Sequence, residues 1–264
     1  MGFFKGSFLF IASVLLLISF LLGNIFLTLN MSLNYETLQS EFTPVVKDVA
    51  EKEFSISSVI VDEQFFLMEL YCQNNSEFVF SESGYTFVIP CDVVAKGSDA
   101  VIEEGINSLV NDIYYQDYDC NFWNCLDKSE VPYFLVSEKA KDYWKGKFYL
   151  SLLISIVLII IIFFLVEQKY NVLTLTGCLL VISSLPLIKL EKLLSFINYK
   201  YVADFLIVFF SKSYSVFLIS FILGIIILGI GIGLKFYMPN SIKKKFSRKE
   251  VKKIVKEEIS KKKK

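Results

Sequence analysis

Four cysteines are the residues of this chain best suited to chemistry, and all four lie in its one long stretch that is polar enough to fold in water. They are Cys72, Cys91, Cys120 and Cys125, while the fifth, Cys178, lies in an apolar run. An even number of cysteines in one small segment is typical of a disulfide-bonded domain in an oxidising compartment. The simplest pairing joins Cys72 to Cys91 and Cys120 to Cys125.

Metal binding and redox catalysis are the alternatives to structural disulfides. Only Cys120 and Cys125 have a spacing that suits one metal ion, which disfavours a four-cysteine site. The chain has no histidine, which excludes Ser-His-Asp and Cys-His catalysis and every zinc site that needs an imidazole. No nucleophile-base pair, phosphate loop or metal motif remains. We therefore expect no enzyme activity, no catalytic residue, no metal and no cofactor.

The loop around the last two of these cysteines combines carboxylates with aromatic side chains. It begins with the spacing of an EF-hand calcium loop, but Phe122 stands where that loop needs glycine and Lys128 where it needs glutamate. A solvated acidic surface is therefore favoured over a looser calcium site. Tyr and Trp are enriched at binding hot spots, which makes the loop a candidate binding patch; packing in the core or on the bilayer surface is the alternative. The candidate patch is Tyr114, Tyr115, Asp117, Tyr118, Asp119, Phe122, Trp123 and Asp127.

Charge is divided between two parts of the chain. From Ser32 to Lys145 there are 21 acidic residues and seven lysines, a net charge of −14. From Lys235 to Lys264 there are 13 basic residues and three glutamates, a net charge of +10. Cytoplasmic flanks of membrane spans carry the excess of Lys and Arg. This predicts a multi-pass protein of the cell membrane with both termini in the cytoplasm and residues 31–146 outside.

Apolar runs predict four transmembrane helices. The apolar run within residues 1–30 is longer than the apolar region of a cleaved signal peptide. We therefore expect residues 1–30 to form a retained signal-anchor helix, with cleavage near Asn24 as the alternative. Residues 147–188 predict a transmembrane hairpin of two helices, and residues 213–236 predict the fourth span. Residues 189–212 are too charged for an ordinary span and predict an interfacial amphipathic segment, with a re-entrant element as the alternative.

Residues 31–146 mix helical and strand patterns. Alternating apolar residues over 77–80 and 85–89 flank a Gly-containing turn, which predicts a β-hairpin. The expected fold class is therefore a membrane α-helical protein with four transmembrane helices and a small disulfide-bonded α+β extracytoplasmic domain between the first and second. Asn74 begins an Asn-Asn-Ser sequon in this domain and is a candidate glycosylation site.

Three features describe the spans and the tail. No charged residue lies in the middle of a predicted span, which disfavours ion-coupled transport by the monomer. Gly229 and Gly233 form a GxxxG motif that predicts close helix packing within the chain, with dimerisation as the alternative. Residues 237–264 form a basic tail, with a capping box at Ser247 that predicts a separate short helix. We expect this tail to contact anionic inner-leaflet lipids, with a solvated tail as the alternative and no nucleic acid.

Three segments carry a resemblance to known proteins. They are Leu-Tyr-Cys-Gln-Asn-Asn from Leu70, Tyr-Asp-Cys-Asn-Phe-Trp-Asn-Cys-Leu from Tyr118 and Ser-Glu-Lys-Ala-Lys-Asp-Tyr-Trp from Ser137. They resemble uncharacterised archaeal integral membrane proteins, a resemblance that implies no activity. The layout of four spans, a large first outer loop and a basic tail is also similar to that of claudins. The claudin Gly-Leu-Trp is missing, however, and one residue instead of two separates Trp123 from Cys125, so the similarity is one of layout and carries no function.

These observations favour a non-enzymatic integral membrane protein. Its disulfide-stapled outer domain is expected to bind or organise a partner in the cell envelope, while its spans lie in the lipid bilayer. A subunit of a membrane transport or channel assembly is the alternative. The glycines of the fourth span and the interfacial segment favour that second reading.

Overall fold

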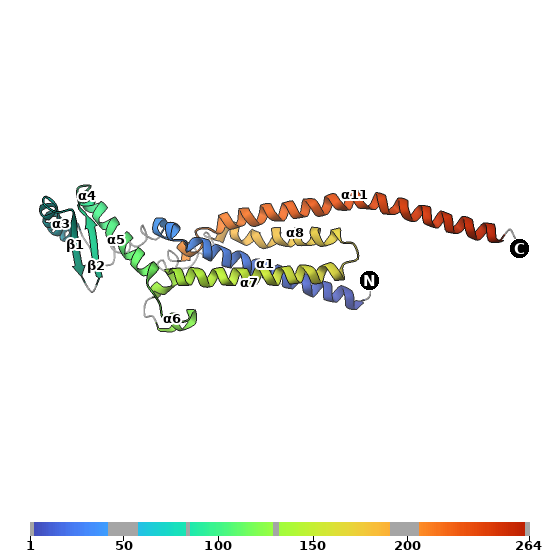
Figure 1. Cartoon of the computed structure of the whole chain (residues 1–264), viewed down its shortest axis with the longest axis horizontal. Coiled ribbons are helices and arrows are strands. Elements are labelled where there is room, and N and C mark those ends of the chain that lie inside the picture. The colour runs from blue at the N-terminus through green and yellow to red at the C-terminus, as the bar shows by residue number, and fades with distance from the viewer. Residues whose placement is uncertain (1–2, 42–57, 83–84, 129–131, 191–205, 262–264) are drawn as a thin grey trace. The chain divides into compact units, whose positions relative to one another are not determined.

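The computed structural model describes residues 3–41, 58–82, 85–128, 132–190 and 206–261. This part of the chain is mostly helical and contains one two-stranded sheet (Figure 1). Four of its helices are long and apolar enough to cross a membrane, as the hydropathy predicts. They are Phe4–Ser32, Glu138–Leu165, Tyr170–Lys189 and Leu206–Tyr237.

The first of two compact units is a helical bundle, formed by Met1–Asn24, Tyr149–Ile188 and Ser215–Lys264. Figure 1 shows its helices side by side. Long runs of Leu, Ile, Val and Phe form helices here because a helix pairs its backbone N–H and C=O groups internally and presents the apolar side chains to lipid. The helices that contribute to it are α1 (Phe3–Ser32), α7 (Glu138–Leu165), α8 (Tyr170–Ser184) with the 3₁₀ turn η2 (Leu185–Lys189), and α11 (Ser213–Lys261).

Helix α11 continues past the predicted end of the fourth span. The capping box at Ser247 was expected to start a separate helix, but Ser247 lies inside α11. Extending an existing helix avoids the cost of nucleation, and the Lys, Glu and Ile residues of this segment are compatible with a helix. The tail is therefore helical up to Lys261 as predicted, and only the predicted start of its helix at Ser247 is wrong.

A polar cluster joins α1 to the other three helices of the bundle. Asn24 in α1 is buried, and its Nδ2 donates to both the carbonyl oxygen and the Oγ of Ser183 in α8, each at 3.3 Å. The Asn24 Oδ1 accepts from Ser220 Oγ in α11 at 2.7 Å. Ser19 Oγ donates to the Ser151 carbonyl of α7 at 3.1 Å, and Ser151 Oγ donates to the Ser19 carbonyl at 2.7 Å.

Close contact between α8 and α11 depends on glycines other than the predicted pair. A Cβ on Gly177 of α8 would lie 2.5 Å from a backbone nitrogen of α11, and one on Gly231 of α11 would lie 2.6 Å from a backbone nitrogen of α8. Nothing lies within 4 Å of a Cβ built on Gly229 or Gly233. The predicted packing of that GxxxG motif within the chain is therefore wrong for the part that the structure describes, because its two glycines lie on the other side of α11.

The second compact unit, Ile25–Phe148 and Lys189–Tyr214, contains the remaining elements. The predicted hairpin is present and antiparallel, with Phe78 opposite Ile89 and Val79 opposite Val88. A short helix, α6, occupies part of the predicted loop. The elements are α3 (Ser58–Cys72), β1 (Glu77–Glu82), β2 (Tyr85–Pro90), α4 (Cys91–Val94), α5 (Ser98–Tyr115), α6 (Phe122–Lys128) and η1 (Pro132–Val136).

Helix α5 takes part in two apolar cores of this unit. Near its start, Val101 packs with Met68 of α3 and Ile89 of β2. Further along, Ile113 and Tyr114 belong to a second core that also contains the C-terminal end of α1, α6, η1 and the first turns of α7. The apolar residues of α5 recur at helical spacing, so one helix can serve both cores.

Two predicted segments fall partly outside the described residues. Residues 42–57 of the predicted outer segment and residues 191–205 of the predicted interfacial segment lie outside them. Residues 206–209 of that second segment are helical, and they belong to the fourth candidate span.

We predict that Asn24→Leu lowers the free energy of unfolding of the bundle by about 1 kcal/mol, because two interhelical hydrogen-bonding groups lose their partner. Reversible denaturation of the purified protein in mixed micelles measures this. Ser13→Ala is the matched control, because Ser13 Oγ donates to Leu9 O within α1 at 2.8 Å. Equal losses in the two variants would contradict a role for Asn24 in joining the helices.

The glycine contacts give a second prediction. Gly177→Ala should destabilise the bundle by about 1–3 kcal/mol, since the new methyl group overlaps the backbone of α11. Gly229→Ala should leave its stability unchanged or slightly raised, because the methyl group meets open space and alanine favours the helix. The same denaturation assay compares them, and a larger loss for Gly229→Ala would show that the assignment of faces is wrong.

Candidate functional site

The structure contains two disulfides, Cys72–Cys91 and Cys120–Cys125, which is the pairing that the sequence favoured. The first joins the last residue of α3 to the first residue of α4, so it closes the hairpin segment at its base. The second connects the residue two positions before α6 with a residue inside α6. Cys178 in α8 is not part of a disulfide.

The structure divides the predicted binding patch into buried and exposed residues. Tyr114 is 2% exposed and its OH donates to Leu33 O at 3.2 Å. Phe122 is 7% exposed and stacks on Tyr143, with ring centroids 3.9 Å apart. The prediction that Tyr114 and Phe122 belong to a surface patch is therefore wrong. Both rings face the core that surrounds the start of α7, where their burial stabilises the fold.

The remaining members of the patch differ in their exposure. Tyr118 is half-buried and its OH donates to Ile113 O at 3.4 Å. Asp127 lies in α6. The members that stay exposed are Tyr115, Asp117, Asp119 and Trp123.

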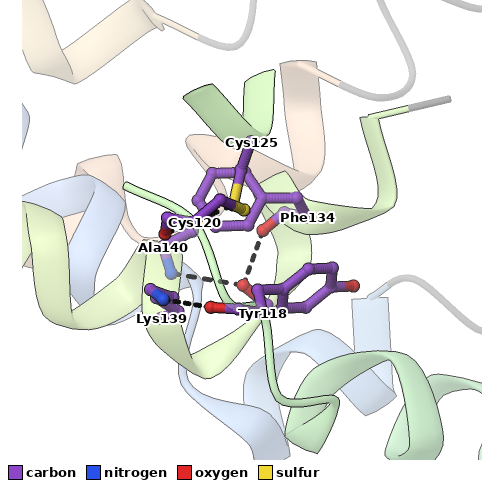
Figure 2. Close-up of a disulfide and its surroundings, with 7 residues drawn as sticks. Tyr118, Cys120, Cys125, Phe134, Lys139 and Ala140 are labelled. Atoms are coloured by element: carbon purple, nitrogen blue, oxygen red, sulfur yellow. Dashed lines mark hydrogen bonds between the residues drawn. A yellow bond between two sulfur atoms is a disulfide. The ribbon is translucent and has the colours of Figure 1, made fainter. Parts of the chain in front are cut away.

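The segment around the second disulfide is attached to the start of α7. Figure 2 shows the Cys120–Cys125 disulfide beside Phe134, with Tyr118 below them. The Tyr118 ring meets the Phe134 ring edge to face, with centroids 5.3 Å apart. Lys139 Nζ in α7 donates to Tyr118 O. Side-chain packing and the disulfide together therefore fix this segment, which places its exposed residues on a rigid support.

An exposed apolar surface on α3 was not predicted. Met68 is buried and Cys72 is partly buried, so one side of the helix packs on the hairpin. The opposite side presents four large side chains that are between 48% and 64% exposed. The sequence does contain a signal for this surface, because residues 65–71 include a single charged residue, Glu69, and are therefore apolar over more of the helix than one buried side requires. The α3 face consists of Phe66, Leu67, Leu70 and Tyr71.

Helix α3 and the elements that pack against it carry exposed carboxylates. They occur on α3, β1, α4 and α5, and Asp92 pairs with Lys96 at 3.7 Å. Among the described residues, no group of three or more His, Cys, Asp or Glu could hold a metal ion. The surface therefore attracts cationic partners through its overall charge. The exposed carboxylates include Glu69, Glu77, Asp92, Asp99 and Glu103.

Asn74, the predicted glycosylation site, is exposed in the turn between α3 and β1. Its backbone N–H donates to Tyr71 O at 3.4 Å. An exposed asparagine in a turn is sterically open to a bulky glycan. Glycosylation of Asn74 stays a prediction.

No protein-family model matches the chain, and no curated protein or solved structure matches it. Function is therefore inferred from the chemistry of the exposed residues. Two surfaces stand out among the described residues: the α3 face and the exposed aromatic side chain of α6.

Loss of either disulfide should destabilise its surroundings by an amount that follows loop length. Cys72 and Cys91 are 19 residues apart, whereas Cys120 and Cys125 are 5 residues apart. We therefore expect the double variant Cys72→Ser/Cys91→Ser to lose about 3 kcal/mol of unfolding free energy. The double variant Cys120→Ser/Cys125→Ser should lose about 2 kcal/mol. Chemical denaturation followed by tryptophan fluorescence measures both. The reverse order would show that strain or packing, and not chain entropy, decides the effect.

Burial gives Tyr114 a pH dependence that can be measured. Burial, together with the nearby Glu138, Tyr115 and Asp142, raises the pKa of Tyr114 from 10.0 to about 12. Between these pH values the unfolded state releases the phenol proton and the folded state keeps it, so stability falls as pH rises from about 10 to about 12. Tyr114→Phe should reduce this fall, and Tyr71→Phe, which replaces an exposed tyrosine on α3 that does not act on Tyr114, should not. Thermal unfolding across this pH range tests the difference, and an unchanged fall in Tyr114→Phe would contradict it.

Proposed function

We propose that this protein is a non-enzymatic integral membrane protein of the cell membrane, whose disulfide-stapled domain lies outside and binds or organises a cell-envelope partner. The observation that carries the proposal is the α3 face. Large apolar patches on soluble surfaces mark interaction sites, because leaving them in water costs free energy that a partner recovers. The Cys72–Cys91 disulfide at the end of α3 supports the helix that presents this face.

The charge around the α3 face indicates the chemistry of the partner. Exposed carboxylates on the neighbouring elements repel another acidic surface and favour one that carries Lys or Arg around an apolar centre. The opposite charge of the C-terminal tail supports the proposed orientation, with both termini in the cytoplasm. There the lysines of the tail attract anionic inner-leaflet lipids, each contributing about 1 kcal/mol near the surface.

Site-specific photo-cross-linking on intact cells tests the proposal. A photoreactive residue at Leu67 or Leu70 should form a cross-link to one envelope component, whereas the same residue at Glu103, exposed on α5, should not. Phe66→Ser should weaken the cross-link from Leu70 at unchanged protein level. Recovery of no partner from either position, or equal recovery from Glu103, would refute binding through the α3 face.

A second candidate function is a subunit of a membrane transport or channel assembly. The open space beside Gly229 and Gly233 favours it, because small residues on an outward side of a span let another helix approach closely. Solute flux in liposomes should then fall in a Gly229→Ile/Gly233→Ile variant. Flux that is unchanged by these substitutions would argue against this candidate.

A further inference from the structure

Trp123 is held in a fixed, outward orientation. Phe122 stacks on Tyr143 at an interplanar angle of 11°, and Cys125 is 3% exposed and bonded to Cys120. Successive residues of a helix point about 100° apart. With Phe122 and Cys125 facing the core, Trp123 must face away from it, and its side chain is 63% exposed. An indole ring has an apolar body and a polar N–H group, so an outward-facing Trp suits a layer that is apolar on one side and wet on the other, such as a membrane interface.

The position of Trp123 along α7 identifies the kind of surface that it faces. Its ring centroid lies 6.4 Å from that of Tyr143 in α7. The apolar run of the α7 span begins at Phe148, five residues later. Five helical residues span about 7.5 Å, and the headgroup layer of a bilayer is about 5–7.5 Å thick on each side. When the apolar run fills the hydrocarbon core, Tyr143 therefore lies at the outer edge of the headgroup layer, and Trp123 lies beside it.

Local charge also favours phospholipid at this level. Residues 138–147, the first turns of α7, contain four lysines and two carboxylates, although the predicted outer segment as a whole is strongly acidic. Lys145 is exposed, and Lys147 Nζ lies 5.1 Å from the centroid of the Tyr143 ring. Lysines at the end of a span extend their ammonium groups toward lipid phosphates, and Tyr and Trp favour the same layer.

We infer that Trp123 is a membrane anchor. Its ring inserts into the headgroup layer of the bilayer beside Tyr143 and Lys147, and the Cys120–Cys125 disulfide holds α6 in the orientation that presents it. The ligand of this surface is phospholipid. This inference does not depend on whether the α3 face binds a partner.

Fluorescence quenching by brominated lipids tests this inference directly. Trp123 and Trp144 are the two tryptophans of the chain, so Trp144→Phe leaves Trp123 as the single reporter. The full chain is reconstituted into phosphatidylcholine vesicles whose acyl chains carry bromine either just below the headgroup or near the methyl end. Shallow bromines should remove more of the Trp123 emission than deep bromines, and aqueous iodide should remove little.

Two further variants guard against a folding artefact. The Trp144 ring stacks on Phe26 with centroids 5.7 Å apart, so Trp144→Phe can disturb packing. Subtracting the fluorescence of Trp123→Phe from that of the wild type gives the Trp123 emission in a protein that keeps Trp144. In Cys120→Ser/Cys125→Ser, shallow quenching should fall and iodide quenching should rise. The inference would be overturned if iodide quenched the Trp123 emission and neither brominated lipid did. It would also be overturned if the deep bromines quenched that emission more strongly than the shallow ones.

Discussion

One buried amide group organises the helical bundle. In lipid, apolar side chains gain nothing by leaving their surroundings for another helix, so association depends on close packing and on hydrogen bonds between helices. Asn24 supplies these bonds to α8 and α11 at once, through Ser183 and Ser220. Unpartnered, an asparagine side chain in hydrocarbon would cost several kcal/mol. The amide therefore selects the arrangement in which α1 contacts both helices.

A different constraint governs the unit that contains the disulfides. Its apolar cores are small, and a small core leaves little stability beyond the entropy cost of folding. The disulfides offset part of that cost. Packing of Phe122 on Tyr143 then ties the shorter disulfide loop to the first turns of α7. The Cys72–Cys91 disulfide supports α3, and the Cys120–Cys125 disulfide with the Phe122–Tyr143 stacking supports α6. Both helices can therefore keep large apolar side chains exposed.

Much of this architecture could be predicted from the sequence. Apolar runs of spanning length located four candidate spans, and alternation around a Gly-containing turn located the hairpin, because each signal is local. Which side of α11 packs against α8 could not be predicted. Gly229 and Gly233 have the spacing of a packing motif, but only the fold shows that Gly177 and Gly231 make the close contacts.

The candidate site shows the same limit. Tyr114 and Tyr115 are adjacent and chemically alike, yet the helix buries the first and exposes the second. Neighbouring residues of α6 divide in the same way, with Phe122 inside and Trp123 outside. Composition therefore identified an aromatic loop. Which of its aromatic side chains are buried and which are exposed could be seen only from the residues that pack against them. The α3 face was missed because the absence of a covering element is not a local property of the sequence.

The proposed function requires the disulfide-stapled domain to lie outside the cell. Labelling of intact cells with a membrane-impermeant maleimide, with and without prior reduction, tests it most directly when mass spectrometry reads each cysteine peptide. With the domain outside and both disulfides formed, labelling of intact cells should occur only after reduction, and without lysis, at Cys72, Cys91, Cys120 and Cys125. Labelling only after lysis would contradict this orientation, because it would place the domain in the cytoplasm. Labelling of intact cells without reduction would contradict the disulfides, because it would show free thiols on the outside.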